Sequence, residues 1–178
     1  MEYNEFLSLA KSRQSCREFN DKPLDKQVVE SIIKTAFLAP SACNSQPWRV
    51  IAVTEEEGLK IVRNAVQERG MNKFADKAKA FLLLVEKEAT LKESTLTRFH
   101  RNYFVKYDVG QLTAYITLTA QSLGVSSCIL GWVNHQTLKD NFDIGENQSC
   151  NLVIALGYSD IPVREKTRKD ADQLITFK

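Results

Sequence analysis

The sequence predicts a compact α+β or α/β protein in which helices cover the faces of a central sheet. Segments with a helical period alternate along the chain with short runs of β-branched and apolar residues. No Gly-x-Gly-x-x-Gly turn, Walker loop or internal repeat is found in the sequence, so the Rossmann and P-loop classes lose their main support. The chain has 178 residues, and we expect one domain over residues 1–178.

The first clear helix is predicted over 25–37, after a short N-terminal helix. Apolar residues recur there at helical spacing, and Asp25 is a suitable N-cap. The helix must stop before Pro40, because the residue preceding a proline is pushed out of helical geometry. The small and polar residues 41–47 that follow are predicted to form a loop.

Two strands and a helix are predicted next. Residues 48–53 are rich in β-branched side chains, which indicates a strand. Thr54 to Glu57 has the form of a capping box, so a helix is expected from there to about Arg69. The short apolar run 81–85 is typical of a strand that is buried on both faces.

A long helix is predicted over about 103–123, with Gly124 as its left-handed C-terminal stop. This helix is apolar around most of its circumference, which indicates burial on several sides, either centrally or at a subunit interface. Residues 152–158 are predicted to form a strand, and residues 174–177 a terminal one. His135 is expected in a surface loop.

Charge and composition exclude several classes of protein. The formal charge is only +2, so no overall field selects nucleic acid or an anionic membrane. No apolar run is long enough to span a bilayer, and the first residues are polar and acidic, so we expect a cytoplasmic protein. The four cysteines lie far apart with no histidines at ligand spacing, so no metal site is expected.

The first segment whose residues could bind a ligand is Arg-Gln-Ser-Cys-Arg-Glu-Phe, residues 13–19. It places two guanidinium groups four residues apart, with the Ser15 hydroxyl between them. Guanidinium groups bind phosphate in forks and keep their charge. Taken alone, however, the segment is more typical of a solvated basic stretch that Phe19 anchors to the core.

The second segment is residues 39–48, Ala-Pro-Ser-Ala-Cys-Asn-Ser-Gln-Pro-Trp. Its small residues allow the backbone to approach a flat ligand, and the Asn44 and Gln46 amides offer both donors and acceptors. Such a loop suits the edge of a heterocycle. The alternative is an ordinary connection from helix to strand, with Trp48 as the first core residue.

Together, the two segments on either side of one helix resemble the FMN site of the nitroreductase family. The pair consists of RxSxRxF at 13–19 and PSxxNxQPW at 40–48. Further landmarks of that family are matched more weakly by residues 71–74, 108–110 and 123–131, and by the basic pair in Lys166-Thr167-Arg168. The resemblance therefore covers most of the chain.

The resemblance implies an FMN-binding site with assigned roles. Arg13, Ser15, Lys166 and Arg168 would bind the phosphate. Arg17 would lie near N1 and O2 of the isoalloxazine, and the Leu130–Gly131 backbone near N5, so that Arg17 and Gly131 tune a flavin that carries the chemistry itself. The other implied flavin contacts are Gln14, Pro40, Ser41, Ala42, Asn44, Gln46 and Asn72. Cys43 is a candidate substrate contact. His100 and Phe104 are two more, because they lie just before the long helix in a segment that forms either a lid over the pocket or ordinary packing at the start of the helix.

The resemblance also implies fold, assembly and activity. The fold would be α+β, with a mixed, mainly antiparallel sheet, in an intertwined homodimer with a long buried central helix and FMN at the subunit interface. The activity would be transfer of hydride from NADH or NADPH to flavin N5, then of electrons to a nitroaromatic or quinone-like acceptor by a ping-pong mechanism. The alternatives are a specialised member such as a dehalogenase, an enone reductase or a flavin-destroying enzyme, a flavin-binding or storage protein without substantial turnover, and a plain dimeric scaffold.

Overall fold

An antiparallel sheet of four strands, in the order β1-β2-β4-β3, forms the centre of the computed structural model, which describes residues 2–178. The strands are β1 (Trp48–Val53), β2 (Ala80–Glu86), β3 (Ser126–Leu130) and β4 (Ser149–Gly157). All three ladders are antiparallel, and a single isolated bridge, Ser15↔Ser127, is parallel. The prediction of an α+β fold with a mainly antiparallel sheet is therefore confirmed, and the α/β alternative is wrong.

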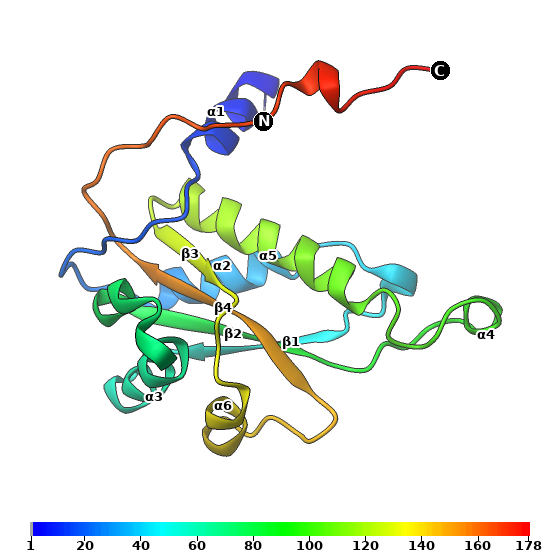
Figure 1. Cartoon of the computed structure of the whole chain (residues 1–178), viewed down its shortest axis with the longest axis horizontal. Helices are drawn as coiled ribbons and strands as arrows, with labels where there is room; N and C mark the ends of the chain where they lie inside the picture. The colour runs from blue at the N-terminus through cyan, green and yellow to red at the C-terminus, as the bar shows by residue number, and fades with distance from the viewer. Residues whose placement is uncertain (1) are drawn as a thin grey trace.

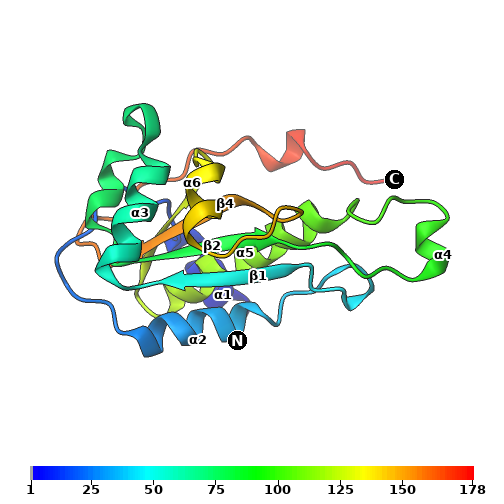
Figure 2. The same cartoon turned by 90° about the horizontal axis from the view of Figure 1, so that it is seen from below.

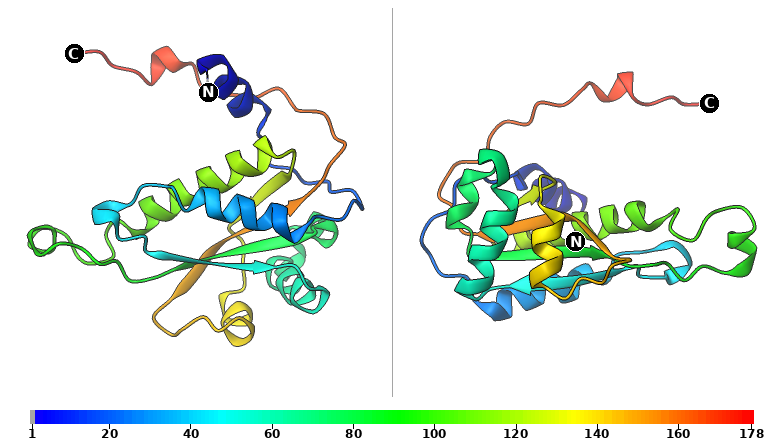
Figure 3. Two further views of the ribbon diagram at one scale, coloured as in Figure 1. Left: turned by 180° about the vertical axis from the view of Figure 1, so that it is seen from behind. Right: turned by 60° about the horizontal axis from the view of Figure 1, so that its bottom comes forward.

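Helices cover both faces of the sheet (Figures 1 and 2). The helices α2 (Lys26–Ala36) and α5 (Val105–Ser122) pack on one face, with α1 (Tyr3–Ser12) outside them, and α3 (Glu56–Val66) and α6 (His135–Asn141) pack on the other. A short helix, α4 (Glu93–Leu96), lies in an arm that projects from the body of the molecule. The C-terminal segment leaves β4, passes beside α1 and runs away from the sheet, as both views of Figure 3 show.

Strand β2 explains why its sequence is a continuous apolar run. Alternate side chains, those of Leu82 and Leu84, pack in the core beneath α2 and α5, while Phe81 and Leu83 pack in the core beneath α3 and α6. These four side chains are 0% exposed. Burial of each contributes about 1.5–3 kcal/mol, so this strand holds the two layers together.

The helix boundaries follow local capping chemistry. The Asp25 side chain accepts a hydrogen bond of 2.8 Å from the backbone N–H of Gln27, so the predicted N-cap of α2 is confirmed. The predicted capping box at Thr54 is wrong, because Glu55 is the N-cap of α3 and its side chain makes no capping bond. The predicted end at Arg69 is also wrong: α3 ends at Val66, and Arg69 itself has a φ of 58°, which no right-handed helix accommodates.

Two further expectations need correction, and a third is confirmed. His135 is the first residue of α6 rather than part of a loop, and its Nδ1 lies 2.9 Å from the carbonyl of Cys150. Residues 174–177 form no strand, because the segment projects beyond the sheet and finds no partner strand among the described residues. Gly124 has the expected left-handed φ of 70°.

Within a single chain, helix α5 is fully buried on one side and only partly covered, by α1, on the other. Its core side chains include Leu112, Ile116 and Ala120, which are 0% exposed. On the opposite side Tyr107 and Tyr115 remain 62% and 41% exposed. The burial on several sides that the sequence predicts is therefore not found within one chain.

Candidate functional site

The Arg13–Phe19 segment is fixed at both ends by the fold. The Arg13 N–H donates to the carbonyl of Leu9 and ends α1, and the Cys16 N–H donates to the carbonyl of Ser127 at 2.9 Å. Phe19 is 2% exposed and packs so closely on Gly157 that a Cβ there would lie 2.9 Å from the ring. A glycine is therefore required at this point of β4 for the segment to dock.

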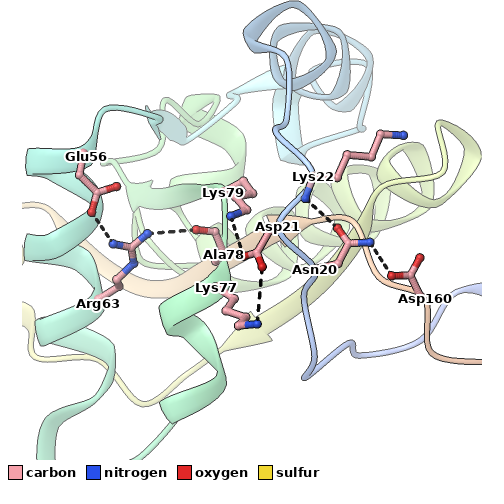
Figure 4. Close-up of polar contacts among 9 residues, drawn as sticks. All are labelled: Asn20, Asp21, Lys22, Glu56, Arg63, Lys77, Ala78, Lys79 and Asp160. Atoms are coloured by element: carbon pink, nitrogen blue, oxygen red, sulfur yellow. Dashed lines mark hydrogen bonds and ion pairs between the residues drawn. The ribbon is translucent and has the colours of Figure 1, made fainter.

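The residues that follow Phe19 are held by polar contacts to two other parts of the chain (Figure 4). The Asn20 amide donates to Asp160 at 2.8 Å, just after β4. Asp21 forms ion pairs with Lys77 and Lys79, with N···O distances of 3.9 and 3.5 Å. Exposed ion pairs of this kind stabilise little individually, so their main effect is to fix the path of the backbone next to Arg17.

The Gln14 side chain joins the N-terminal segment to the C-terminal one. Its Oε1 accepts bonds from the backbone N–H and the Nε of Arg164, at 3.1 and 3.3 Å, and its Nε2 donates to the carbonyl of Pro162 at 3.1 Å. Arg164 also donates to the carbonyl of Ser15 at 2.9 Å, and Lys166 donates to that of Arg13. Gln14 therefore holds the two segments together with the amide that was predicted to contact flavin.

These contacts create a pocket of about 350 Å³ with a strong excess of positive charge, which we call the cation pocket. Five cationic side chains and one carboxylate line it. Its lining residues are Arg13, Gln14, Ser15, Arg17, Arg164, Glu165, Lys166, Thr167 and Arg168. The structure thus brings together Arg13, Ser15, Lys166 and Arg168, the four residues expected at a phosphate, although they come from opposite ends of the sequence.

Arg13 is the least satisfied cation of the pocket. Its Nε and Nη2 are buried and have no hydrogen-bond partner within residues 2–178. Burial, reinforced by Arg168, lowers the pKa of Arg13, and burial together with Arg168, Arg13 and Arg164 lowers that of Lys166. Buried donors and crowded like charges both cost free energy, and a bound anion would relieve both at once.

Arg164 is a pocket residue that the sequence reasoning missed. It contributes three of the hydrogen bonds that hold the segments together. A signal for it was present, because Arg164, Lys166 and Arg168 recur at every second position of an extended segment. Residues with that spacing point to the same side of an extended chain.

Arg17 lies where the cation pocket meets a second, larger groove of about 660 Å³. That groove is also lined by Lys73, Phe74 and Ile161. Asn72, immediately before Lys73, has a left-handed φ of 46° and donates from its side chain to the carbonyl of Val66 at 2.9 Å. Asn72, which was expected near the flavin ring, is thus adjacent to the groove, and its Nδ2 is hydrogen-bonded to the backbone of its own chain.

Leu130 and Gly131 lie at the end of β3, the strand that pairs with the Arg13–Phe19 segment through Ser127. Leu130 is 2% exposed and belongs to the core, whereas Gly131 is exposed just beyond the strand. A Cβ at Gly131 would meet only ordinary van der Waals contact, at 3.9 Å from Leu152. The backbone of Gly131 is therefore accessible from solvent.

The loop 40–47 has an unusual backbone that a buried carboxylate supports. Cys43, Asn44 and Gln46 have φ values of 53°, 52° and 47°, a conformation that is uncommon for residues other than glycine. Both carboxylate oxygens of Asp108 accept the Ala42 N–H, at 3.1 and 3.2 Å, and Asp108 is 2% exposed. Burial raises the pKa of Asp108, although the bond from Ala42 opposes the shift.

This loop lies at the opposite end of α5 from the cation pocket. Asp108, which holds the loop, is in the first turn of α5, while Ser127, beside the pocket, follows the end of α5. With a rise of 1.5 Å per residue, the first and last turns of this helix are on the order of 20 Å apart. Within one chain the structure therefore does not bring Pro40, Ser41, Ala42, Asn44 and Gln46 to the cation pocket.

Two substitutions of Asp108 should separate the contribution of its hydrogen bond to stability from the contribution of its buried charge. We expect Asp108→Ala to lower the free energy of unfolding by about 1–3 kcal/mol, because the Ala42 N–H loses its acceptor. Asp108→Asn keeps an acceptor and removes a buried charge, so we expect it to stabilise the protein at neutral pH. Because the Asp108 carboxyl has a higher pKa in the folded protein, its protonation favours folding below the pKa of the unfolded chain, about 3.9. This contribution to stability is lost as the pH rises through the folded-state pKa.

Urea denaturation of wild type and both variants between pH 4 and 8 measures these effects. The advantage of Asp108→Asn over wild type should grow as the pH rises and shrink on acidification. A pH-independent difference between these two proteins would contradict the assignment of a buried carboxylate with a raised pKa.

The candidate substrate residues lie near the loop 40–47 rather than near the cation pocket. The Cys43 thiol is exposed and lies 3.7 Å from the Thr95 hydroxyl, and hydrogen bonds from the Lys92 backbone and from Thr95 lower its pKa. Phe104 packs edge-on against Phe99, with ring centroids 5.0 Å apart. His100 lines a pocket of about 400 Å³ at the base of the arm.

In residues 2–178 we find no group of three or more histidine, cysteine, aspartate or glutamate side chains placed to hold a metal ion. Among the same residues, no helix has the length and apolar character needed to cross a bilayer.

The fold and the pocket define an α+β protein with a strongly cationic pocket, and comparison with known proteins identifies its family. The model of the nitroreductase family matches residues 10–158. A protein of Archaeoglobus fulgidus, provisionally named NADH dehydrogenase/NAD(P)H nitroreductase, is 30% identical over 94% of this chain and 91% of its own length. The chain belongs to the nitroreductase family.

Two solved structures show the same fold. A nitroreductase family protein from Clostridium difficile 630 superimposes with a TM-score of 0.81 at 24% identity, covering 100% of this chain and 99% of that one. An FMN-dependent nitroreductase from Clostridium difficile R20291 superimposes with a TM-score of 0.74 at 23% identity, covering 96% and 98%. The helices and the antiparallel sheet are thus those of the family throughout the chain.

Proposed function

We propose that this protein is an FMN-dependent oxidoreductase that accepts hydride from NADH or NADPH and reduces a nitroaromatic or quinone-like acceptor. The observation that carries this proposal is that two nitrogens of the Arg13 guanidinium, Nε and Nη2, are buried without a partner among residues 2–178, in a pocket with four other cations. A phosphate monoester supplies the charge and the acceptor oxygens that these groups lack. Membership of the family and the FMN dependence of the relative from Clostridium difficile R20291 support FMN as the molecule that carries this phosphate.

The residues present fit the phosphate end of FMN. Arg13, Lys166 and Arg168 would neutralise its charge, and the Ser15 hydroxyl would donate one further hydrogen bond. Arg17, at the junction of the cation pocket and the larger groove, would place a fixed cation beside N1 and O2 of the ring. Such a cation favours the negative charge that two-electron reduction leaves at that edge.

When bound, FMN supplies the hydride-accepting position N5, and the protein supplies binding, orientation and charge. The exposed backbone of Gly131 at the end of β3 would face that position and tune it. None of the described side chains is required as a nucleophile or as an acid–base pair in this scheme. Because nucleotide and acceptor would use the same face of the ring in turn, we expect ping-pong kinetics.

We also propose that the protein works as a homodimer whose two flavin sites lie at the subunit interface. The partly covered side of α5 forms an apolar groove of about 580 Å³ with α1 and α2, lined among others by Phe6, Leu9, Tyr115 and Leu118. The C-terminal segment also exposes apolar side chains, with Phe177 at 93%. A second copy would cover these surfaces and would bring its own loop 40–47 to the cation pocket.

The alternatives that share this pocket are a flavin-binding or storage protein and a specialised reductase, such as a dehalogenase or an enone reductase. Every phosphate contact named above would serve storage as well as catalysis. The two classes differ in whether the bound flavin exchanges electrons with a nucleotide and an acceptor, which is a property that can be measured directly.

The test is the visible spectrum of the purified protein, recorded before and after anaerobic addition of NADH or NADPH. We expect the visible absorption band of an oxidised flavin, which bleaches with at least one nucleotide and returns when a nitroaromatic or quinone is added. A flavin band that neither nucleotide bleaches would favour storage. No flavin band after incubation with FMN would remove the proposal altogether.

A further inference from the structure

Two of the four free cysteines are lateral neighbours beneath the cation pocket. Ser15 and Ser127 form a parallel bridge, and the Cys16 N–H donates to the Ser127 carbonyl at 2.9 Å. In a regular parallel pair the residues that follow a bridge lie side by side, roughly 4.8 Å apart, with their side chains on the same face. The Ser15–Ser127 bridge is isolated, so the two residues that follow it are placed by this one bridge and not by a continuing ladder. Cys16 and Cys128 are those residues.

Burial places both thiols in the same core. Cys16 and Cys128 are 1% and 2% exposed, and both belong to the cluster that also contains Phe19 and Leu130. Disulfides form when the two Cα atoms lie 4.4–6.8 Å apart, roughly the spacing of neighbouring strands. At present the Cys16 thiol donates to the Glu18 carbonyl at 3.2 Å, so a change of side-chain rotamer is needed before the two sulfurs meet.

We propose that Cys16 and Cys128 are an oxidisable dithiol that forms an intrachain disulfide, linking the Arg13–Phe19 segment covalently to β3. The oxidant is a hydroperoxide. One thiol attacks the peroxide oxygen, giving a sulfenic acid and one molecule of water (or alcohol). The second thiol then displaces water from this sulfenic acid, so that two thiols and one peroxide yield one disulfide. A small dithiol reverses the reaction.

Cys16 is the thiol that reacts first, because its segment pairs with the sheet at one isolated bridge and is otherwise held by side-chain contacts, whereas Cys128 is paired in a ladder along β4. Opening of that bridge exposes Cys16, and a segment with few backbone bonds opens more readily than a strand inside a sheet. Burial raises the pKa of Cys128, which slows its own attack on an oxidant. The other two cysteines differ, since Cys43 is exposed and Cys150 is buried at the start of β4.

The test treats the full-length protein with hydrogen peroxide, blocks the remaining thiols with N-ethylmaleimide in denaturant, and maps peptides without reductant. We expect a peptide joining Cys16 to Cys128, a loss of two of the four thiols beyond any oxidation of Cys43, and reversal by dithiothreitol. Urea below the unfolding transition should accelerate the reaction. A non-reducing gel should show the oxidised protein at the mobility of a single chain.

Two cysteine variants test whether the disulfide joins Cys16 to Cys128. Cys43→Ser should form the same linked peptide, whereas Cys128→Ala should lose it and leave Cys16 as a sulfenic acid that dimedone traps. Oxidation should raise the melting temperature of wild type and of Cys43→Ser by several degrees, and that of Cys128→Ala not at all. The proposal is overturned if Cys43 alone is oxidised, or if Cys16 and Cys128 both react with N-ethylmaleimide in full after peroxide treatment.

Discussion

Arg13→Ala is expected to weaken FMN binding on the order of 10- to 100-fold, the effect of losing charged hydrogen bonds to one group. The same substitution should leave the stability of the flavin-free protein unchanged or raise it. The reason is that the Arg13 Nε and Nη2 are buried without a partner in the part of the chain that the structure describes. Their removal abolishes a desolvation cost and reduces the repulsion exerted on Lys166.

Two measurements on each protein separate these effects. Titration of FMN, followed by the quenching of its fluorescence, gives the dissociation constant, and urea denaturation of the flavin-free protein gives the stability. Lys60→Ala removes an exposed cation from α3 and serves as the control, with neither quantity expected to change appreciably. Arg13→Ala protein that binds FMN as tightly as wild type would refute the phosphate role, and a large loss of stability would indicate a structural role instead.

Mixing two variants that each bind FMN weakly is expected to restore tight binding to some of the sites, if each site takes its cation pocket from one chain and its loop from the other. The first variant is Arg13→Ala. The second carries Asn44→Gly and Gln46→Gly, which remove both amides at positions with φ of 52° and 47°, where glycine fits without strain. The two glycine substitutions should therefore keep the backbone conformation of the loop.

Random assortment of the two chains by joint refolding should give heterodimers in half of the dimers, each with one intact site and one site with both lesions. About a quarter of all sites should then bind FMN tightly. The readout is the flavin retained on a desalting column, compared with each variant refolded alone. Retention no greater than the average of the separate variants would show that each site is built within one chain.

The elements that the sequence predicted well are those whose local pattern and tertiary environment agree. Strand β2 is apolar at every position from Ala80 to Val85 and is buried on both faces. Helix α2 has both an amphipathic period and a capping aspartate. In both elements local propensity and burial favour the same structure, so the pattern alone is sufficient.

The elements that were missed depend on partners that lie far away in the sequence. Strand β3 begins with Ser126 and Ser127, which have little intrinsic preference for a strand, and it forms because β4 supplies a complete ladder. Helix α6 is only seven residues long, too short for a period to be recognised. Its N-cap was nevertheless present in the sequence, since Asn134 Oδ1 accepts the N–H of Thr137 at 3.0 Å.

For the candidate site, residue type predicted which side chains share a pocket better than it predicted how each one is used. Arg13, Lys166 and Arg168 do meet. The sequence could not show that the Gln14 amide oxygen accepts a hydrogen bond from Arg164, or that Asp108 in α5 accepts one from the loop 40–47. Both are contacts between distant segments, and only the folded backbone brings the partners together.

The cation pocket also bears on the order of events during synthesis. It is built from residues 13–17 and 164–168, so its two halves can meet only after all four strands of the sheet have been made. The sheet can assemble earlier, because β4 ends at Gly157. The sheet can therefore be complete while the pocket is still open, and the pocket closes only when the segment that follows β4 docks on Gln14 and Ser15.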